Sequence, residues 1–200
     1  MPRPLASDFP RSGWPAPDER DVDKRFAPVP LFNGVCRPIA KTDMTSDQLF
    51  DAAILAARQS PNRVRHVGAA LMQPNTTRTV LACNDFPLGV IDTEQRHAGN
   101  GRFIWMEHAE RNAIYAAARG GLSTEGATLA STFFPCLECA RAIVQAGITR
   151  LLTLEPDLSD PVWGESFVPS TTILSEGGVQ VNYMPRDAAQ VHASTMRPID

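Results

Sequence analysis

Residues 127–154 read ATLASTFFPCLECARAIVQAGITRLLTL, and the pattern of apolar side chains changes twice along this stretch. The runs 127–132 and 148–154 are short and apolar, which is typical of buried strands. Between them, residues 135–147 begin with a proline and end with a glycine, which favour a helix start and a helix end. A strand, a helix and a second strand in this order predict two parallel strands joined by a crossover helix.

The flanking segments continue this alternation. Thr45 or Ser46 can cap a helix whose apolar residues recur at helical spacing and which ends before Pro61. A long polar stretch from Asn84 to Gly101 is expected to form a loop. The remaining expected elements are strands over 67–73, 79–83 and 178–184, a helix from about 107 to 119, and a weaker helix over 167–176. Because the first two strands form a hairpin, the pattern predicts an α/β sandwich with a mostly parallel second half.

The proline content divides the chain into three predicted parts. Eight of the seventeen prolines lie in residues 1–43, and each restricts the backbone, so we expect an extended N-terminal arm there. Its large apolar side chains predict packing either on its own domain or on a partner subunit. Residues 44–185 are expected to form the folded domain, and residues 186–200 a loose polar tail.

The composition is typical of a globular chain, with 43% hydrophobic and 20% charged residues. No apolar stretch approaches the roughly 18 residues of a transmembrane helix, and the N-terminus lacks a signal-peptide core, so we expect no membrane partner and a cytoplasmic location. The net charge of -3 argues against a nucleic-acid partner and favours a small-molecule substrate. Four cysteines are too few for a disulfide scaffold, which leaves metal binding or catalysis.

Two short motifs carry residues suited to metal chemistry, and each lies at a predicted helix start. One contains His108 and Glu110, and the other contains Pro135, Cys136 and Cys139. Cysteines three residues apart in a first helical turn share a face, and the free N–H groups there favour thiolates. With one imidazole, they make a three-ligand zinc site whose fourth position stays open for water, as in catalytic sites.

Glu110 follows the predicted ligand His108 by two residues. Its side chain therefore points about 200° around the helix axis from that of His108, which is a poor position for a fourth ligand. A carboxylate beside a zinc-bound water can take a proton and return it to a leaving group. The motifs thus indicate hydrolytic attack on an electrophilic carbon.

The two motifs, H-x-E and P-C-x-x-C, resemble the signature of the zinc-dependent nucleobase deaminases. The longer strings HAERNAI (108–114) and FPCLECARAIVQAGI (134–148) resemble the deoxycytidylate deaminase branch of the cytidine deaminase-like superfamily, and a weaker similarity covers residues 45–155. The resemblance implies a three-layer α/β/α sandwich with a mixed five-stranded sheet. It also implies deamination of a cytosine-type nucleotide or nucleoside, in which zinc hydroxide attacks the amino-bearing ring carbon and ammonia leaves.

Carried over by position, the resemblance implies one zinc ion per chain, held by His108, Cys136 and Cys139. Glu110 would be the proton shuttle. The implied substrate-binding positions are Asn84, which would hold the sugar or ring, and the backbone of Ala109 and Pro135, which would lie beside the amidine edge of the base. The insert before the helix of the first motif departs from the family pattern, because residues 84–107 contain no cysteine and so predict no second zinc site.

Other residues are candidates for substrate contacts on chemical grounds alone. Phe103, Trp105 and Trp163 could stack on a base or close the pocket, although core or interface packing is an equal alternative for the first two. Trp163 is the strongest candidate because it lies in a predicted loop. Three arginines could bind a phosphate, and the sequence does not choose among Arg63, Arg65 and Arg102.

Several alternatives remain open at this point. The same chemistry suits guanine, another amino-purine, another amino-heterocycle or transfer-RNA adenosine, and the acidic balance argues against the last. A zinc-binding structural or regulatory protein is a non-enzyme alternative, against which the intact Glu110 argues, and a redox dithiol is a third. The apolar arm and the family resemblance predict a homo-oligomer.

Overall fold

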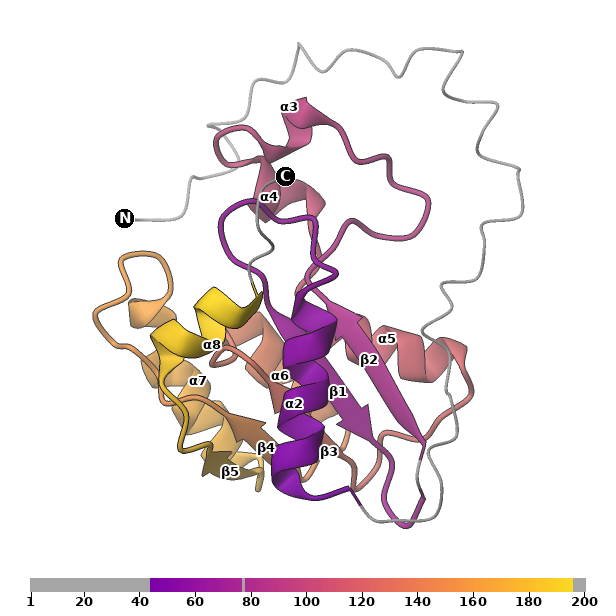
Figure 1. The fold of residues 1–200 in the computed structure, drawn as a ribbon. Helices are drawn as coiled ribbons and strands as arrows, with labels where there is room; N and C mark the ends of the chain where they lie inside the picture. The colour runs from indigo at the N-terminus through magenta and orange to yellow at the C-terminus, as the bar shows by residue number, and fades with distance from the viewer. Residues whose placement is uncertain (1–43, 77, 196–200) are drawn as a thin grey trace. The chain divides into compact units, whose positions relative to one another are not determined.

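The computed structural model describes residues 44–76 and 78–195 (Figure 1). The predicted arm, residues 1–43, lies outside the described residues. All described residues fall within one compact unit of the chain, Gly34–Asp200. Within the described part, no helix has the length and apolar character needed to cross a membrane.

A mixed five-stranded sheet forms the middle layer, with the strand order β2-β1-β3-β4-β5. The strands are β1 (Gly68–Met72), β2 (Thr79–Cys83), β3 (Thr128–Ser131), β4 (Arg150–Thr153) and β5 (Gln180–Tyr183). Strand β1 is antiparallel to both β2 and β3, whereas β3, β4 and β5 are parallel. The predicted hairpin and the predicted parallel second half are both confirmed.

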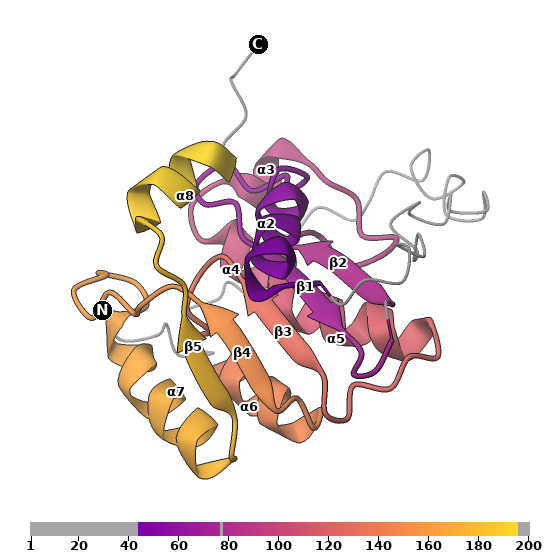
Figure 2. The same ribbon diagram turned by 60° about the horizontal axis from the view of Figure 1, so that its bottom comes forward.

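Helices cover both faces of this sheet, which confirms the three-layer α/β/α sandwich (Figure 2). Helices α2 (Ser46–Ala57) and α8 (Ala188–Thr195) pack on one face. Helices α5 (Ala109–Arg119), α6 (Leu137–Gln145) and α7 (Gly164–Glu176) pack on the other. Because both faces are covered, the inner strands are apolar on both sides, and β3 and β4 are almost wholly buried.

Helix α2 begins where its cap predicts. The Thr45 hydroxyl accepts a hydrogen bond from the Gln48 N–H at 3.2 Å, and the Gln48 side chain accepts one from the Thr45 N–H at 2.9 Å. The helix packs directly on β1 at Gly68, where an added Cβ would lie 2.0 Å from the Ala53 carbonyl oxygen. Only glycine permits this approach, so Gly68 sets the distance between helix and sheet.

The long polar stretch differs from the expected loop because it contains one short helix, α3 (Glu94–His97), and a second, α4 (Gly101–Trp105), begins at its last residue. Side-chain contacts order this insert: His97 binds Asp92 at 2.6 Å and meets the Phe86 ring edge to face, and Glu94 of α3 pairs with Arg63 from outside the insert. Helices this short are not stable alone, so no local pattern announces them.

Residues 186–200, expected as a loose polar tail, instead contain a helix. Residues 188–195 form α8, in which Val191 and Thr195 are buried. Its last carbonyl groups accept hydrogen bonds from elsewhere: the Arg58 side chain donates to Ser194 O at 3.0 Å, and His66 Nδ1 lies 2.8 Å from Thr195 O. These partners are far away in the sequence, which explains why the weakly amphipathic segment gave no clear helix signal.

Candidate active site

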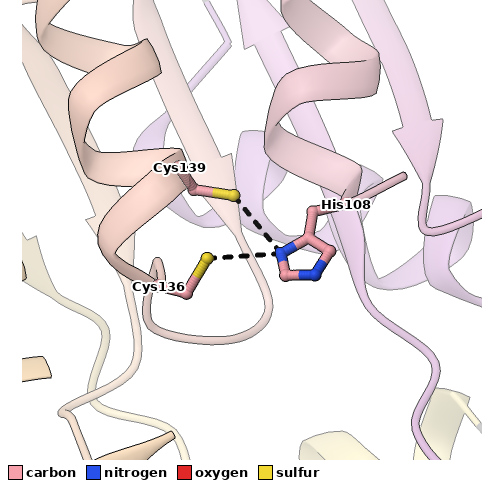
Figure 3. Close-up of side chains that lie close together, drawn as sticks. All are labelled: His108, Cys136 and Cys139. Carbon is pink, nitrogen blue, oxygen red and sulfur yellow. Dashed lines mark hydrogen bonds between the residues drawn. The ribbon is translucent and has the colours of Figure 1, made fainter. Parts of the chain in front are cut away.

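The starts of α5 and α6 bring the three predicted ligands together (Figure 3). His108 is the N-cap residue of α5, Cys136 is the N-cap residue of α6, and Cys139 lies in the first turn of α6. His108 Nδ1 lies 3.4 Å from Cys136 Sγ and 3.5 Å from Cys139 Sγ. Within the described residues, these three side chains form a group able to hold a metal ion, with ligand atoms within 4.8 Å of one another.

The donor set and spacing fit zinc. Zinc bonds of about 2.3 Å to sulfur and about 2.05 Å to nitrogen, at tetrahedral angles, place nitrogen and sulfur about 3.6 Å apart. The two nitrogen-to-sulfur distances are close to this value. One imidazole and two thiols also leave the fourth tetrahedral position for a non-protein ligand.

The electrostatics of the group favour a thiolate at Cys136. The pKa of Cys136 is lowered to about 4, because the Cys139 thiol donates a hydrogen bond to its sulfur and because His108 adds a second bond and positive charge. The pKa of Cys139 is correspondingly raised by Cys136 and by burial. A divalent cation replaces the shared protons and allows both sulfurs to bind as thiolates.

Glu110 lies beside the metal group but does not share its face. Its side chain is 3% exposed, with Oε2 3.4 Å from Cys139 Sγ and Oε1 3.3 Å from Ser131 Oγ. Burial raises the pKa of Glu110, because a carboxylate away from water is disfavoured. A carboxyl group with a raised pKa next to a metal position is suited to moving protons near neutral pH.

Arg111 is a neighbour of the metal group that the motif analysis missed. Its guanidinium pairs with Glu107 and places Nη1 3.9 Å from Cys139 Sγ. The Glu107 carboxylate also accepts the His108 N–H at 2.9 Å, so this pair holds the start of α5 and adds positive charge near a thiolate. The spacing of four residues between Glu107 and Arg111 is the sequence signal that points to the pair.

A cavity of about 180 Å³ opens over the metal group. Its lining includes two of the predicted ligands, His108 and Cys136, together with Glu110, while Cys139 is fully buried behind it. Among the predicted substrate-binding residues, the cavity is lined by Asn84, Ala109, Phe103 and Trp163. Pro135 is buried and does not belong to the lining.

Asn84 lies in the cavity wall, but its amide also holds the fold. Its Oδ1 accepts the Val67 N–H at 2.8 Å, and its Nδ2 donates to the Arg65 carbonyl at 2.9 Å. One acceptor lone pair and one N–H remain for a ligand. The residue therefore fixes the segment before β1 as well as facing the cavity.

Trp163 lies between the metal group and the cavity mouth. Its ring meets His108 edge to face at a centroid distance of 5.3 Å, and Phe103 at 5.8 Å. Phe103, on α4, and Trp163, directly before α7, thus share one wall. Trp105 does not line the cavity.

The structure distinguishes the three candidate arginines. Arg63 pairs with Glu94 and lies outside the cavity lining. Arg65 lines the cavity and pairs with Asp160 at 3.0 Å, with its guanidinium 4.2 Å from the centre of the Phe133 ring. Arg102 also lines the cavity, lies over the Phe103 ring, and makes no ion pair within the described residues.

Two further residues of the lining were not anticipated. Asn62 accepts hydrogen bonds from the N–H groups of Val64 and Arg65, which shapes the loop before β1. Asp160 comes from the loop after β4 and also lines the cavity. An Asx turn is foreseeable at the Asp-Pro step from Asp160, but its pairing with Arg65 has no local signal.

A His/Cys/Cys group at two neighbouring helix starts, beside a mixed sheet and a buried glutamate, defines a protein of the zinc-dependent deaminase class. A family model described as the cytidine and deoxycytidylate deaminase zinc-binding region matches residues 44–155. The chain belongs to this family and is a hydrolytic deaminase.

Named relatives agree with this assignment. The chain is 32% identical over 143 residues to an uncharacterized deaminase in the luxG 3' region of Aliivibrio fischeri, covering 70% of this chain and 93% of the relative. It is 44% identical over 80 residues to the deoxycytidylate deaminase of Enterobacteria phage T2, covering 40% of this chain and only 39% of the phage protein. The fold is similar to that of the dCMP deaminase of cyanophage S-TIM5 in complex with dCMP and dUMP, with a TM-score of 0.57, 23% identity, and coverage of 71% of this chain and 100% of that one.

Proposed function

We propose that this deaminase acts on a cytosine-type nucleotide or nucleoside, with a deoxycytidylate-like substrate as the first choice. The observation that carries the proposal is the position of Glu110, buried in the cavity wall beside the His108, Cys136 and Cys139 group. The relatives named as deoxycytidylate deaminases support the choice of base.

In the proposed reaction, His108, Cys136 and Cys139 hold one zinc ion per chain. Zinc, when bound, supplies a water molecule of lowered pKa. Glu110 accepts the proton that this water loses and donates a proton to the ring nitrogen next to the amino-bearing carbon. The water oxygen bonds to that carbon. Glu110 then takes the remaining proton from this oxygen and passes it to the amino group, so that the carbon–nitrogen bond breaks, ammonia leaves and a carbonyl remains. The raised pKa of Glu110 suits both directions of transfer.

The cavity walls suit a flat heterocycle. Trp163 and Phe103 supply aromatic surface on one wall, and Phe133 and Phe134 supply it on another. Planar bases are held by such surfaces, with a few polar groups to orient them. The remaining hydrogen-bonding capacity of Asn84 provides one such group.

The charge at the cavity mouth supports an anionic substrate. Two arginines and one aspartate lie there, and the Arg65 charge is offset by Asp160. Arg102, which makes no ion pair within the described part of the chain, remains to bind an anionic group such as a phosphate. We therefore place the nucleotide ahead of the nucleoside.

The test is a substrate panel on the zinc-loaded full chain, with ammonia release as the readout. The panel contains dCMP, deoxycytidine, cytosine, guanine, adenine and a transfer-RNA anticodon stem-loop. We expect the highest kcat/KM for dCMP. Turnover of guanine, adenine or the transfer-RNA stem-loop with no activity on any cytosine compound would overturn the proposed substrate.

A further inference from the structure

Asp160 connects two parts of the cavity that come from distant segments of the chain. Its carboxylate is 6% exposed and accepts three hydrogen bonds. Oδ1 accepts the N–H groups of Val162 and Trp163, both at 2.9 Å, and Oδ2 accepts Arg65 Nη2 at 3.0 Å. One side chain thus holds both the loop that carries Trp163 and the Arg65 guanidinium, which comes from the segment before β1.

The first connection places an aromatic ring against the metal group. The bond from the Trp163 N–H to Asp160 fixes the turn immediately before α7, and the Trp163 ring lies edge-on to His108. The turn is tight, because a Cβ on Gly164 would lie 2.4 Å from the Leu158 carbonyl oxygen. Because this turn has little room to adjust, a shift of the Asp160 carboxylate would also shift Trp163.

The second connection controls charge. Arg65 lines the cavity, and its guanidinium is held between Asp160 and the face of Phe133. Burial alone would raise the pKa of Asp160, but the hydrogen bonds from Val162 and Trp163 and the Arg65 charge outweigh it, so the pKa lies below its ordinary value. Asp160 is therefore ionised at neutral pH, and its charge cancels that of Arg65.

We propose that Asp160 is a positioning residue that limits how strongly the cavity binds an anionic substrate group, because it withholds Arg65 from the substrate while it holds Trp163 against His108. The inference rests on the proposed function for its choice of substrates. It assigns the binding of the anionic group to Arg102 and assigns to Arg65 a structural pairing that the substrate does not break.

Two substitutions separate these effects. In Asp160→Asn, the amide oxygen still accepts the two backbone N–H groups, but the amide nitrogen cannot accept from Arg65, so the loop stays and the Arg65 charge is released. In Asp160→Glu, the negative charge stays near Arg65, but the longer side chain misplaces the acceptor for Trp163. Asp157→Asn is the matched control, because Asp157 lies exposed in the same loop and its carboxylate bonds, among the residues that the structure describes, to Ser159 alone.

The first measurement is calorimetric titration of each zinc-loaded protein with inorganic phosphate, which does not depend on the identity of the base. We expect Asp160→Asn to bind phosphate roughly tenfold more tightly than the wild type, since removing one nearby negative charge favours an anion, whereas Asp157→Asn changes by less than about twofold. Unchanged or weaker phosphate binding by Asp160→Asn would overturn the proposal.

The second measurement compares kcat/KM for dCMP and deoxycytidine. The ratio should rise roughly tenfold in Asp160→Asn, while Asp160→Glu should keep the wild-type ratio and lose kcat on both compounds. A changed ratio in Asp160→Glu with unchanged kcat would contradict the division of roles. If the wild type deaminates neither compound, the proposed function fails, and the phosphate titration still decides the role of Asp160.

Discussion

The Trp163 indole lies edge-on to the His108 imidazole, with ring centroids 5.3 Å apart and ring planes at 84°. This contact joins the loop after β4 to the metal group at the start of α5. Trp163 therefore both lines the proposed substrate cavity and packs on the predicted zinc ligand His108. Substitution of Trp163 tests its part in substrate binding and its part in supporting the metal group.

Trp163→Ala should raise KM without loss of zinc. An aromatic side chain stacked on a base contributes about 1–3 kcal/mol, so we expect KM to rise by roughly 5- to 150-fold, and Trp163→Phe to restore most of the loss. Steady-state kinetics with dCMP and zinc analysis check this. Tyr115→Ala, at an exposed aromatic residue of α5, is the control. An unchanged KM in Trp163→Ala would remove Trp163 from the substrate wall.

Cys136→Ser and Cys139→Ser should each lose bound zinc and all measurable ammonia release, because a hydroxyl is a poor replacement for a thiolate ligand. The zinc-to-protein ratio, measured by atomic absorption, checks this. Cys83→Ser is the matched control, since Cys83 is a buried cysteine of β2 outside the metal group. A full equivalent of zinc in Cys139→Ser would show that this sulfur is not a ligand.

Glu110→Gln should keep zinc and lose turnover. Removing a general acid–base group typically lowers kcat by about 10²- to 10⁴-fold, and glutamine preserves the size of the side chain. Comparison with Glu176→Gln, at the far end of α7, controls for the loss of one negative charge. Wild-type kcat in Glu110→Gln would refute the proton-shuttle role.

Removal of residues 188–200 should weaken both the fold and the cavity. Helix α8 buries Val191 and Thr195, and its last carbonyl groups bind Arg58 and His66 at the two ends of the loop that carries Asn62 and Arg65. We expect a loss of about 2 kcal/mol in urea unfolding and a higher KM. Removal of residues 196–200 alone serves as the comparison. Equal stability of the two truncated proteins would exclude a structural role for α8.

We also propose that the full chain forms a homo-oligomer, on the grounds of the large apolar side chains within residues 1–43 and of the family. Light scattering should show more than one copy for the full chain. A monomer at micromolar concentration, both with and without residues 1–43, would contradict this.

The local sequence was sufficient for most of the fold. Thr45 caps α2, as one of the two predicted cap residues. Gly120 is the C-cap residue of α5, and Gly147 follows the C-cap residue of α6. The strands lie within the predicted apolar runs. These features depend on contacts within a few residues, which is why periodicity and caps reveal them. The metal group could also be predicted from the sequence, because the start of a helix fixes the direction of the side chains that it carries.

Tertiary structure alone decided the surroundings of that group. Arg65 and Asp160 are 95 residues apart in the chain, and nothing near either residue indicates that they pair or that Arg102 lines the same cavity. Helix α8 is likewise ordered by the distant Arg58 and His66, and Glu94 of α3 pairs with the distant Arg63. A short helix or a buried charge is stable only where the fold supplies its partner. The sequence motifs therefore predicted the metal-binding residues and Glu110, whereas tertiary packing determined the charge and shape of the cavity mouth.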